Sequence, residues 1–415
     1  MQTAELDRSL IPPLRETRAG VRAALPIAAP AIAKAAVAKA AISKAAKKRI
    51  AFLYLGRRGG IARLAYELAV AATRHQQIDP LFVVSDSNEL FGLMQTLPGV
   101  ARSVKTFESS VGALTQTYRI PSLIQGLNAA FNDHGTETIV VLASHVWSPL
   151  IAPFLKTTGR RYVVVVHDAD PHPGDVTGLA HGWLLREAAQ ADLVIALSRA
   201  VAAALSTRRR IPSDRIVTLF HPLLTYTEKG AQAVWDGKRP LRLLSFGRMM
   251  DYKGLGIFTE AIELLRAQGL PVEATVAGSG QMNGQRAKLE TLGATVINRW
   301  LHDQELSQLL QAHDAVVLTH TEASQSGCAA AALGAGLPVI ATPVGGLMEQ
   351  IAHDVNGLVA DRVDAGAIAH QITRIVNNPT LYRELAQGVV RQQRGREMCD
   401  FLDNMVDAIP QSANL

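Results

Sequence analysis

The sequence predicts an α/β protein made of two successive doubly wound parallel sheets, and three observations lead to this prediction. The chain has 415 residues, which is too long for one ordinary domain. Its apolar runs of strand length, such as TIVVLAS and RYVVVVHD, are continuous rather than alternating. Continuous runs indicate strands covered on both faces, as in a parallel sheet. The strand and helix pattern lapses over residues 223–240 and then restarts, so a linker separates two units.

The overall composition describes a chain with ample material for a core. Hydrophobic residues make up 48% and charged residues 19% of the sequence. The two cysteines, Cys328 and Cys399, are too few for a disulfide framework and fit a reducing compartment. No Cys/His cluster has the spacing of a zinc site, so we expect no structural metal.

Residues 1–48 form an Ala/Lys-rich tail that we predict to be disordered. They hold nine Lys/Arg and three Asp/Glu, which accounts for the whole net charge of +6. The balanced remainder argues against a nucleic-acid partner. We expect neither a membrane-spanning helix nor a signal peptide, and therefore a cytoplasmic protein. Two interpretations of the tail stay open: a flexible extension, or a weak tether to anionic lipid at the inner face of the membrane.

The first predicted domain covers residues 49–226. It begins with the strand RIAFLYLG, a turn that contains Gly59 and Gly60, and the helix IARLAYELAVAATRH. The second covers 239–392, where the runs LRLLSFGR, VEATVAG, ATVIN, DAVVLTH and LPVIAT each precede a helical segment. Residues 393–415 predict a C-terminal helix that returns toward the first domain. A ligand is expected in the cleft, at the carboxyl ends of the strands.

Two glycine turns follow the first strands of the second domain. SFGRMMDYKG carries Gly247 for tight backbone geometry and then Arg248 and Lys253, a planar fork and a point charge suited to phosphate oxygens. VAGSGQ carries Gly278, whose turn can bring backbone N–H groups close to a ligand. The alternatives are two solvated cations and an ordinary connecting turn.

The segment TEASQSG follows the strand AVVLTH. It offers the carboxylate of Glu322 and, at Gln325, Ser326 and Gly327, the start of a helix whose free N–H groups can bind an anion. The alanines after it allow close approach of sheet or ligand. The alternative is a helix capped by Ser326 with an alanine-rich packing face.

The order FGR…KG, AGSG and E…GLPVIATPVGG…E…NGL resembles the nucleotide-sugar half of glycosyltransferase family 4, which has the two-domain GT-B fold. The resemblance covers nearly everything from Arg49 onward. It implies that Arg248 and Lys253 bind the diphosphate of the sugar donor and that Glu322 lies near the transferred sugar. The other donor-side positions that it implies are Gly59, Gly60, Gly247, Gly278, Gln325, Ser326, Gly327 and Glu349.

One departure from the family pattern concerns the ribose. The family usually carries a second acid eight positions after the first, and here that place falls near Ala330 or Ala331. The wording EASQSG is similar to a branch of bacterial polysaccharide glycosyltransferases that also lacks this acid. Ribose contact and nucleotide choice therefore cannot be carried over.

The first domain offers polar residues just beyond the strand RYVVVV. The segment HDADPHPGD places His167, Asp168 and His172 there, and it resembles an HD…HPG segment of the same branch, where acceptor and donor sugars meet. His167 would bind the donor sugar or steer the acceptor hydroxyl. The alternative is a histidine that caps a helix or has its hydrogen bonds satisfied within the core. His145 in ASHVWS is a companion on the acceptor side.

The letters DAD at 168–170 also spell the metal-chelating signature of the single-domain GT-A glycosyltransferases. A protein of that type would bind its nucleotide near the N-terminus and leave residues 243–360 without a role. We therefore expect no metal and no cofactor.

The predicted function is transfer of a sugar from a nucleoside-diphosphate donor to a saccharide or a polyprenyl-diphosphate-linked saccharide in polysaccharide biosynthesis. Retention of configuration and independence from metal are implied by the resemblance. Two alternatives stay open: a nucleotide-sugar 2-epimerase of GT-B fold, and a catalytically inert homologue that binds nucleotide sugar. A dehydrogenase is disfavoured, because no GxGxxG with a downstream acid follows either first strand.

Overall fold

The computed structural model describes residues 47–98, 101–107, 109–171, 178–226 and 234–410. All but the last two residues of the predicted tail, and the candidate site residue His172, lie outside these ranges. Within them, no helix is both long enough and apolar enough to cross a membrane. We call residues 47–226 the first half and residues 234–397 the second half.

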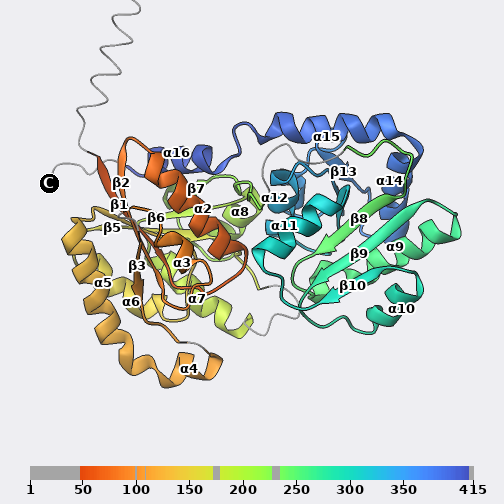
Figure 1. Ribbon diagram of the computed structural model, residues 1–415. Coiled ribbons are helices and arrows are strands. Elements are labelled where there is room, and N and C mark those ends of the chain that lie inside the picture. The colour runs from red at the N-terminus through yellow and green to blue at the C-terminus, as the bar shows by residue number, and fades with distance from the viewer. Residues whose placement is uncertain (1–46, 99–100, 108, 172–177, 227–233, 411–415) are drawn as a thin grey trace, which may run out of the picture. The chain divides into compact units, whose positions relative to one another are not determined.

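Seven strands form the sheet of the first half, in the order β3-β2-β1-β4-β5-β6-β7 (Figure 1). All neighbouring strands pair in parallel. The strands are β1 (Lys48–Tyr54), β2 (Ile78–Ser85), β3 (Ala101–Val104), β4 (Thr138–Val141), β5 (Arg161–Val166), β6 (Leu193–Ala196) and β7 (Ile216–Thr218).

The continuous apolar runs are explained by burial on both faces of this sheet. In β5, Val163 and Val165 enter the hydrophobic cluster on one face, whereas Val164 and Val166 enter the cluster on the other. Successive side chains of a strand point to opposite faces of the sheet. When both faces are covered, every position of the strand is buried and is therefore apolar.

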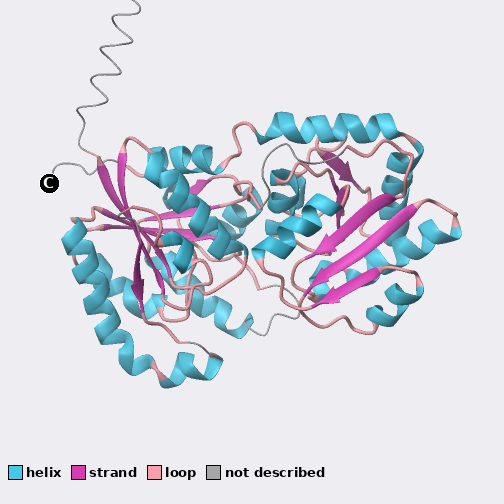
Figure 2. Ribbon diagram, viewed as in Figure 1, coloured by secondary structure: helices cyan, strands magenta, loops and turns pink. Residues whose placement is uncertain are grey.

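The helices of the first half connect these strands, as the ribbon coloured by secondary structure shows (Figure 2). They are α2 (Gly60–Arg74), α3 (Phe91–Met94), α4 (Ser110–Thr115), η1 (Thr117–Arg119), α5 (Ile120–His134), α6 (Ser148–Lys156), α7 (Gly178–Gln190), α8 (Arg199–Thr207) and η2 (Ser213–Arg215).

The second half contains six parallel strands in the order β10-β9-β8-β11-β12-β13. Together the two sheets confirm the predicted architecture of two doubly wound parallel units. The strands are β8 (Leu241–Phe246), β9 (Val272–Gly278), β10 (Thr295–Asn298), β11 (Ala315–Leu318), β12 (Val339–Ala341) and β13 (Gly357–Val359). The helices are η3 (Asp251–Lys253), α9 (Leu255–Ala267), α10 (Gln285–Thr291), α11 (Asp303–Ala312), α12 (Gly327–Gly334), α13 (Leu347–Gln350), α14 (Ala365–Asn377) and α15 (Pro379–Gln393).

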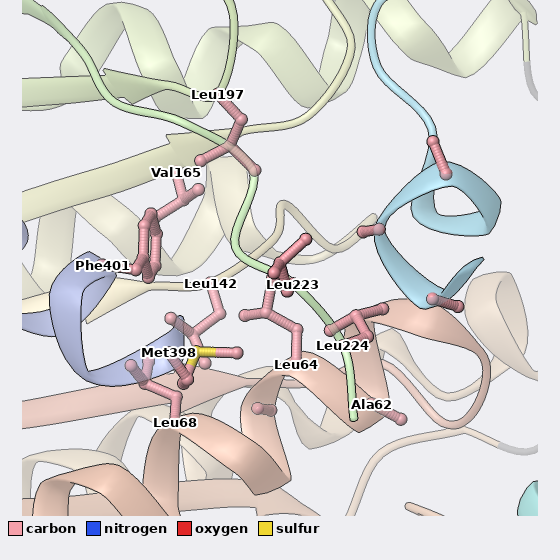
Figure 3. Packing of buried hydrophobic residues seen from close by; sticks show 14 of the residues in the cluster. Ala62, Leu64, Leu68, Leu142, Val165, Leu197, Leu223, Leu224, Met398 and Phe401 are labelled. Carbon is pink, nitrogen blue, oxygen red and sulfur yellow. The ribbon is translucent and has the colours of Figure 1, made fainter. Parts of the chain in front are cut away.

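The last helix, α16 (Met398–Ala408), packs against α2 of the first half rather than against the second sheet. Figure 3 shows Met398 and Phe401 of α16 in the same apolar cluster as Leu68 of α2. The Nζ of Lys48 also donates to the carbonyl of Val406 at 3.0 Å. The last described helix therefore lies on the half that contains β1 and α2.

Leu224, near the end of the first half, lies against α12, and this contact requires small residues on one side of that helix. The N–H of Leu224 donates to the carbonyl of Ala330 at 3.3 Å. A Cβ on Gly334 would lie 2.2 Å from the carbonyl oxygen of Leu224. Ala330 and Ala331 are both buried. The position at which the family usually carries its second acid is therefore packed within the protein. Figure 3 shows Leu223 and Leu224 in this cluster.

Candidate functional site

Each sheet has one place where the strand order reverses. Arg248, Lys253 and Glu322 follow the two strands at this place in the second sheet, and Gly59 and His145 follow those in the first, whereas His167, Gly278 and Glu349 come after neighbouring strands or at their ends. In the second sheet, β8 and β11 are neighbours while their successors β9 and β12 lie on opposite sides. In the first sheet the same holds for β1 and β4. Such a reversal leaves a crevice at the carboxyl ends of the strands, where α/β proteins bind ligands.

The turns after β8 and β9 touch through two glycines. Gly278 has a φ of 144°, and a Cβ there would lie 1.8 Å from the carbonyl oxygen of Gly247. Gly247 itself has a φ of 114°, and its Cβ would lie 2.8 Å from the Sγ of Cys328 at the start of α12. The ends of β8 and β9 and the start of α12 therefore meet so closely that neither Gly247 nor Gly278 has room for a Cβ.

Replacing Gly278 by alanine is expected to cost about 3 kcal/mol of the free energy of unfolding, because the new Cβ meets backbone in a left-handed conformation. Urea denaturation of the purified protein measures this loss. Gly126→Ala in α5 is the matched control, since nothing lies within 4 Å of the added Cβ. Equal stability of the two variants would contradict the assigned packing.

The two predicted phosphate-binding cations differ in how they are held. Arg248 is exposed and makes no hydrogen bond or ion pair with any described residue. Lys253 ends η3, is half-buried, and its Nζ lies 2.7 Å from the Nε2 of His320. His320 comes directly after β11 and is 2% exposed. The sequence prediction missed this histidine, although its position at a strand end beside Glu322 was a signal of a site.

The turn from β11 to α12 holds Glu322 and the predicted helix start. Glu322 is exposed. The hydroxyl of Ser326 accepts from the N–H of Ala329 at 3.3 Å and is buried, so this side chain is the helix cap. Its own N–H donates to the Oε1 of Gln350 at 2.7 Å. The N–H groups of Gly327 and Cys328 have no acceptor among the described residues, so the anion-binding capacity of α12 resides in these two backbone groups.

Glu349 lies on α13, and its carboxylate binds the first half. It accepts hydrogen bonds from the N–H of Arg199 at 2.9 Å and of Ala200 at 3.1 Å, which begin α8. A carboxylate at a helix N-terminus is stabilised by the free N–H groups and the helix dipole. The Oγ of Ser198 likewise donates to the carbonyl of Ser324 at 2.8 Å. Glu349 therefore joins the two halves in this structure.

The glycine turn after β1 lies against the second half. Gly59 has a φ of 91°, its N–H donates to Glu89 at 2.7 Å, and Gly60 begins α2. A Cβ on Gly59 would lie 3.6 Å from the ring of Trp300, and the guanidinium of Arg58 stands 5.2 Å from the same ring.

His167 follows β5 and is engaged at both ring nitrogens. Its Nε2 lies 2.8 Å from the carbonyl of Leu142, and its Nδ1 lies 3.0 Å from the Nε2 of Gln325 in the other half. Because a carbonyl only accepts, Nε2 carries the proton and Nδ1 accepts from the amide. Burial lowers the pKa of His167, which favours this neutral form. Asp168 beside it is half-buried.

His145 follows β4, and its ring stacks on that of Phe107 at 4.8 Å between centroids. Its Nδ1 accepts from the N–H of Trp147 at 3.3 Å. Burial and the charge of Arg57 lower the pKa of His145 to about 4, so it is neutral at physiological pH. The structure thus uses His145 as a packed aromatic ring with one nitrogen engaged.

A pocket of about 410 Å³ is lined by both halves and contains Glu322. Asp170 also lines this pocket and forms ion pairs with Arg208 and, at 3.0 Å, with Arg209. The second carboxylate of the DAD sequence is thus held by two guanidinium groups. Among the described residues, no group of three or more His, Cys, Asp and Glu side chains is arranged to hold a metal ion.

Two family models match the chain in succession. The model described as "Glycosyltransferase Family 4" matches residues 58–222, and the model described as "Glycosyl transferases group 1" matches residues 240–378. Their border falls in the linker, and together they take in every strand of the two sheets except β1.

Similar proteins come from several lineages. The amylovoran biosynthesis glycosyltransferase AmsK of Erwinia amylovora is 31% identical over 153 residues, which are 33% of this chain and 36% of that protein. A glycogen synthase of Mycobacterium tuberculosis is 28% identical over 255 residues, 56% of this chain and 57% of that protein. The chain thus matches between about a third and just over half of the length of these relatives. Among solved structures, HepE of Anabaena in complex with UDP-glucose superposes with a TM-score of 0.66 at 17% identity, over 87% of this chain and 100% of that chain.

Proposed function

Since the chain belongs to family 4 of the GT-B glycosyltransferases, we propose that it moves a sugar from a nucleoside-diphosphate donor to a hydroxyl group of a saccharide or a lipid-linked saccharide. One observation carries this proposal. The loop with Arg248 and Lys253 and the turn with Glu322 follow the adjacent strands β8 and β11, at the reversal point of the second sheet. A fold relative that binds UDP-glucose supports a nucleotide sugar as the ligand.

The chemical difficulty of this reaction is charge. As the glycosidic bond breaks, the leaving diphosphate gains negative charge and the sugar becomes cationic. Groups that are fixed in place beforehand stabilise such charge without the cost of reorienting solvent. Lys253, Arg248 and the free N–H groups of Gly327 and Cys328 neutralise the leaving diphosphate, so the proposed reaction needs no metal ion.

The sugar itself would lie in the pocket that contains Glu322. This carboxylate is exposed on the pocket wall and would accept hydrogen bonds from sugar hydroxyl groups. Retention of configuration is part of the proposal and rests on the family. Glu349 has a structural partner in α8, so we assign it a role in joining the halves and not in holding the nucleotide.

His167 would serve the sugar rather than the nucleotide, because its bond to Gln325 lies beside the turn that carries Glu322. His167→Ala is therefore expected to lower kcat by at least about tenfold, ~1.4 kcal/mol, while the Kd for the free nucleoside diphosphate changes less than threefold. Steady-state kinetics and calorimetry measure the two quantities. Equal losses in kcat and in nucleotide affinity would contradict the assignment of His167 to the sugar site.

The relative AmsK acts in amylovoran biosynthesis by its name, which supports a role of this chain in polysaccharide assembly. We propose a polyprenyl-diphosphate-linked saccharide as acceptor. The excess of basic residues in 1–48 would then provide weak contact with an anionic membrane, worth on the order of 1 kcal/mol per residue near the surface.

Transfer assays test the proposed function. Full-length protein is incubated with radiolabelled UDP- and GDP-sugars and a polyprenyl-diphosphate saccharide, and the lipid and nucleotide fractions are separated. Label in the acceptor supports the proposal. Interconverted free sugar nucleotide would support the epimerase alternative, and tight nucleotide binding without turnover would support an inert binding homologue.

A further inference from the structure

We propose that His320 is a positioning residue that holds the ammonium group of Lys253 in place for the diphosphate of the sugar donor. The inference rests on the proposed function and assigns a role to a residue outside the family pattern described above. It starts from one contact: the Nζ of Lys253 lies 2.7 Å from the Nε2 of His320.

In this contact the lysine ammonium group is the hydrogen-bond donor and the imidazole is the acceptor. A lysine ammonium group has donors and no acceptor, so the imidazole accepts at Nε2 and carries its proton on Nδ1. A neutral acceptor fixes the ammonium without cancelling its charge, whereas a carboxylate in the same place would neutralise it. Two of the three N–H donors of Lys253 stay available for phosphate oxygens.

The loop that carries Lys253 is tied to the strand end on both sides of His320. The single hydroxyl proton of Thr319 is shared between the carbonyls of Lys253 and Gly254, which lie 3.0 Å and 2.9 Å from its Oγ1. The N–H of Thr321 donates to the carbonyl of Tyr252 at 2.8 Å. Three consecutive residues after β11 thus hold η3, two through its backbone and the middle one through the lysine side chain.

His320 is itself immobilised. It is 2% exposed, its carbonyl accepts from the Oγ1 of Thr342 at 2.5 Å, and its ring packs edge-on against Tyr252 with centroids 6.0 Å apart. A lysine side chain has many rotamers and loses much entropy when it is ordered. Holding it before the ligand arrives removes part of that cost from binding. Arg248, exposed and without a partner among the described residues, has no such support and provides the internal comparison.

Three substitutions of His320 distinguish a role in positioning Lys253 from a role in packing alone. In His320→Gln, the end of the amide occupies the place of Nε2 and can still accept from Lys253. In His320→Asn, the shorter amide occupies the place of Nδ1 and cannot reach it. His320→Phe keeps the ring volume and removes the acceptor. Calorimetry then gives Kd values for UDP, GDP, UMP and GMP with the full-length protein.

We expect His320→Phe and His320→Asn to weaken binding of the preferred nucleoside diphosphate about tenfold and of its monophosphate less than twofold, while His320→Gln stays within about threefold of the wild type. His320→Phe should add nothing to Lys253→Met, because it acts through that lysine. Its effect should multiply with that of Arg248→Ala.

Equal losses for diphosphate and monophosphate, or independent effects of His320→Phe and Lys253→Met, would overturn the inference. The thermal midpoint of each variant is recorded alongside; if His320→Phe does not fold, the comparison of His320→Gln with His320→Asn decides. A wild type that binds none of UDP, GDP, ADP and TDP would instead contradict the proposed function, and the inference with it. If nucleoside-diphosphate binding depends on Lys253 but not on His320, the proposed function is still supported, and only the positioning role of His320 is contradicted.

Discussion

Replacing Lys253 by methionine is expected to lower kcat/KM for the nucleotide-sugar donor at least about tenfold, a loss of ~1.4 kcal/mol of transition-state stabilisation. Methionine keeps the length of the side chain and removes its charge. Because the charge on the leaving diphosphate grows as the bond breaks, the ammonium group is worth more in the transition state than in the bound ground state. The loss should therefore fall on kcat more than on KM.

Lys288→Met is the matched control for this experiment. Lys288 is an exposed lysine of α10, paired with Glu263 at 2.7 Å, and takes no part in the candidate site. Its replacement should leave kcat/KM within about twofold of the wild type. Unchanged kinetics in Lys253→Met would reject the assignment of this lysine to the diphosphate.

The second large effect concerns stability and pH. Glu187 on α7 is fully buried, and its Oε1 accepts from the hydroxyl of Tyr162 at 2.6 Å. Burial raises the pKa of Glu187 from 4.5 to about 7, an effect that the Tyr162 hydrogen bond only partly offsets. Between these two values the folded state keeps a proton that the unfolded chain has lost. This contribution to stability is complete below pH 4.5 and is lost as the pH rises through 7.

Between pH 4.5 and 7.5, the free energy of unfolding of the wild type, measured relative to that of Glu187→Gln, should fall by about 3 kcal/mol. Denaturant unfolding at pH 4.5, 5.5, 6.5 and 7.5 measures the difference. The pKa values of His145 and His221 are lowered to about 4, so these residues act with the opposite sign, but they are present in both proteins and cancel in the difference. Glu137→Gln, at an exposed ion pair with Arg49, is the control. A pH-independent difference for Glu187→Gln would contradict a raised pKa.

The fold could be predicted because its signals are local. A run such as RYVVVV has to be buried on both faces, and the lapse near 223–240 separates two such sets of runs. The glycines of the β8 and β9 turns could be found in the same way, since a strand that ends in glycine before a polar loop is visible in the sequence. The structure adds that Gly247 and Gly278 meet each other.

The partners of the site residues could not be predicted, because they come from distant parts of the chain. Gln325 meets His167, Glu349 meets the start of α8, and Lys253 meets His320. Nothing in the spacing of these residues encodes the contacts. The side chain of Ser326, in contrast, has a local partner that the sequence could indicate. It caps α12, as the alternative interpretation of this segment proposed.

The alanine-rich helix after EASQSG also has an explanation that only the structure supplies. The small side chains were expected to allow close approach of sheet or ligand. The segment that approaches α12 is the end of the first half at Leu224, through its N–H to Ala330 and its carbonyl against Gly334. An acid near Ala330 would be buried among apolar neighbours, which is costly without a partner.

A crystal structure of the protein with its preferred nucleoside diphosphate, chosen by thermal shift among UDP, GDP, ADP and TDP, would show directly whether Lys253 and the start of α12 bind the diphosphate. We expect oxygens of the diphosphate at about 3 Å from the Nζ of Lys253 and from the N–H groups of Gly327 and Cys328, with the guanidinium of Arg248 turned toward them. A diphosphate bound elsewhere, with Lys253 still held only by His320, would contradict this assignment.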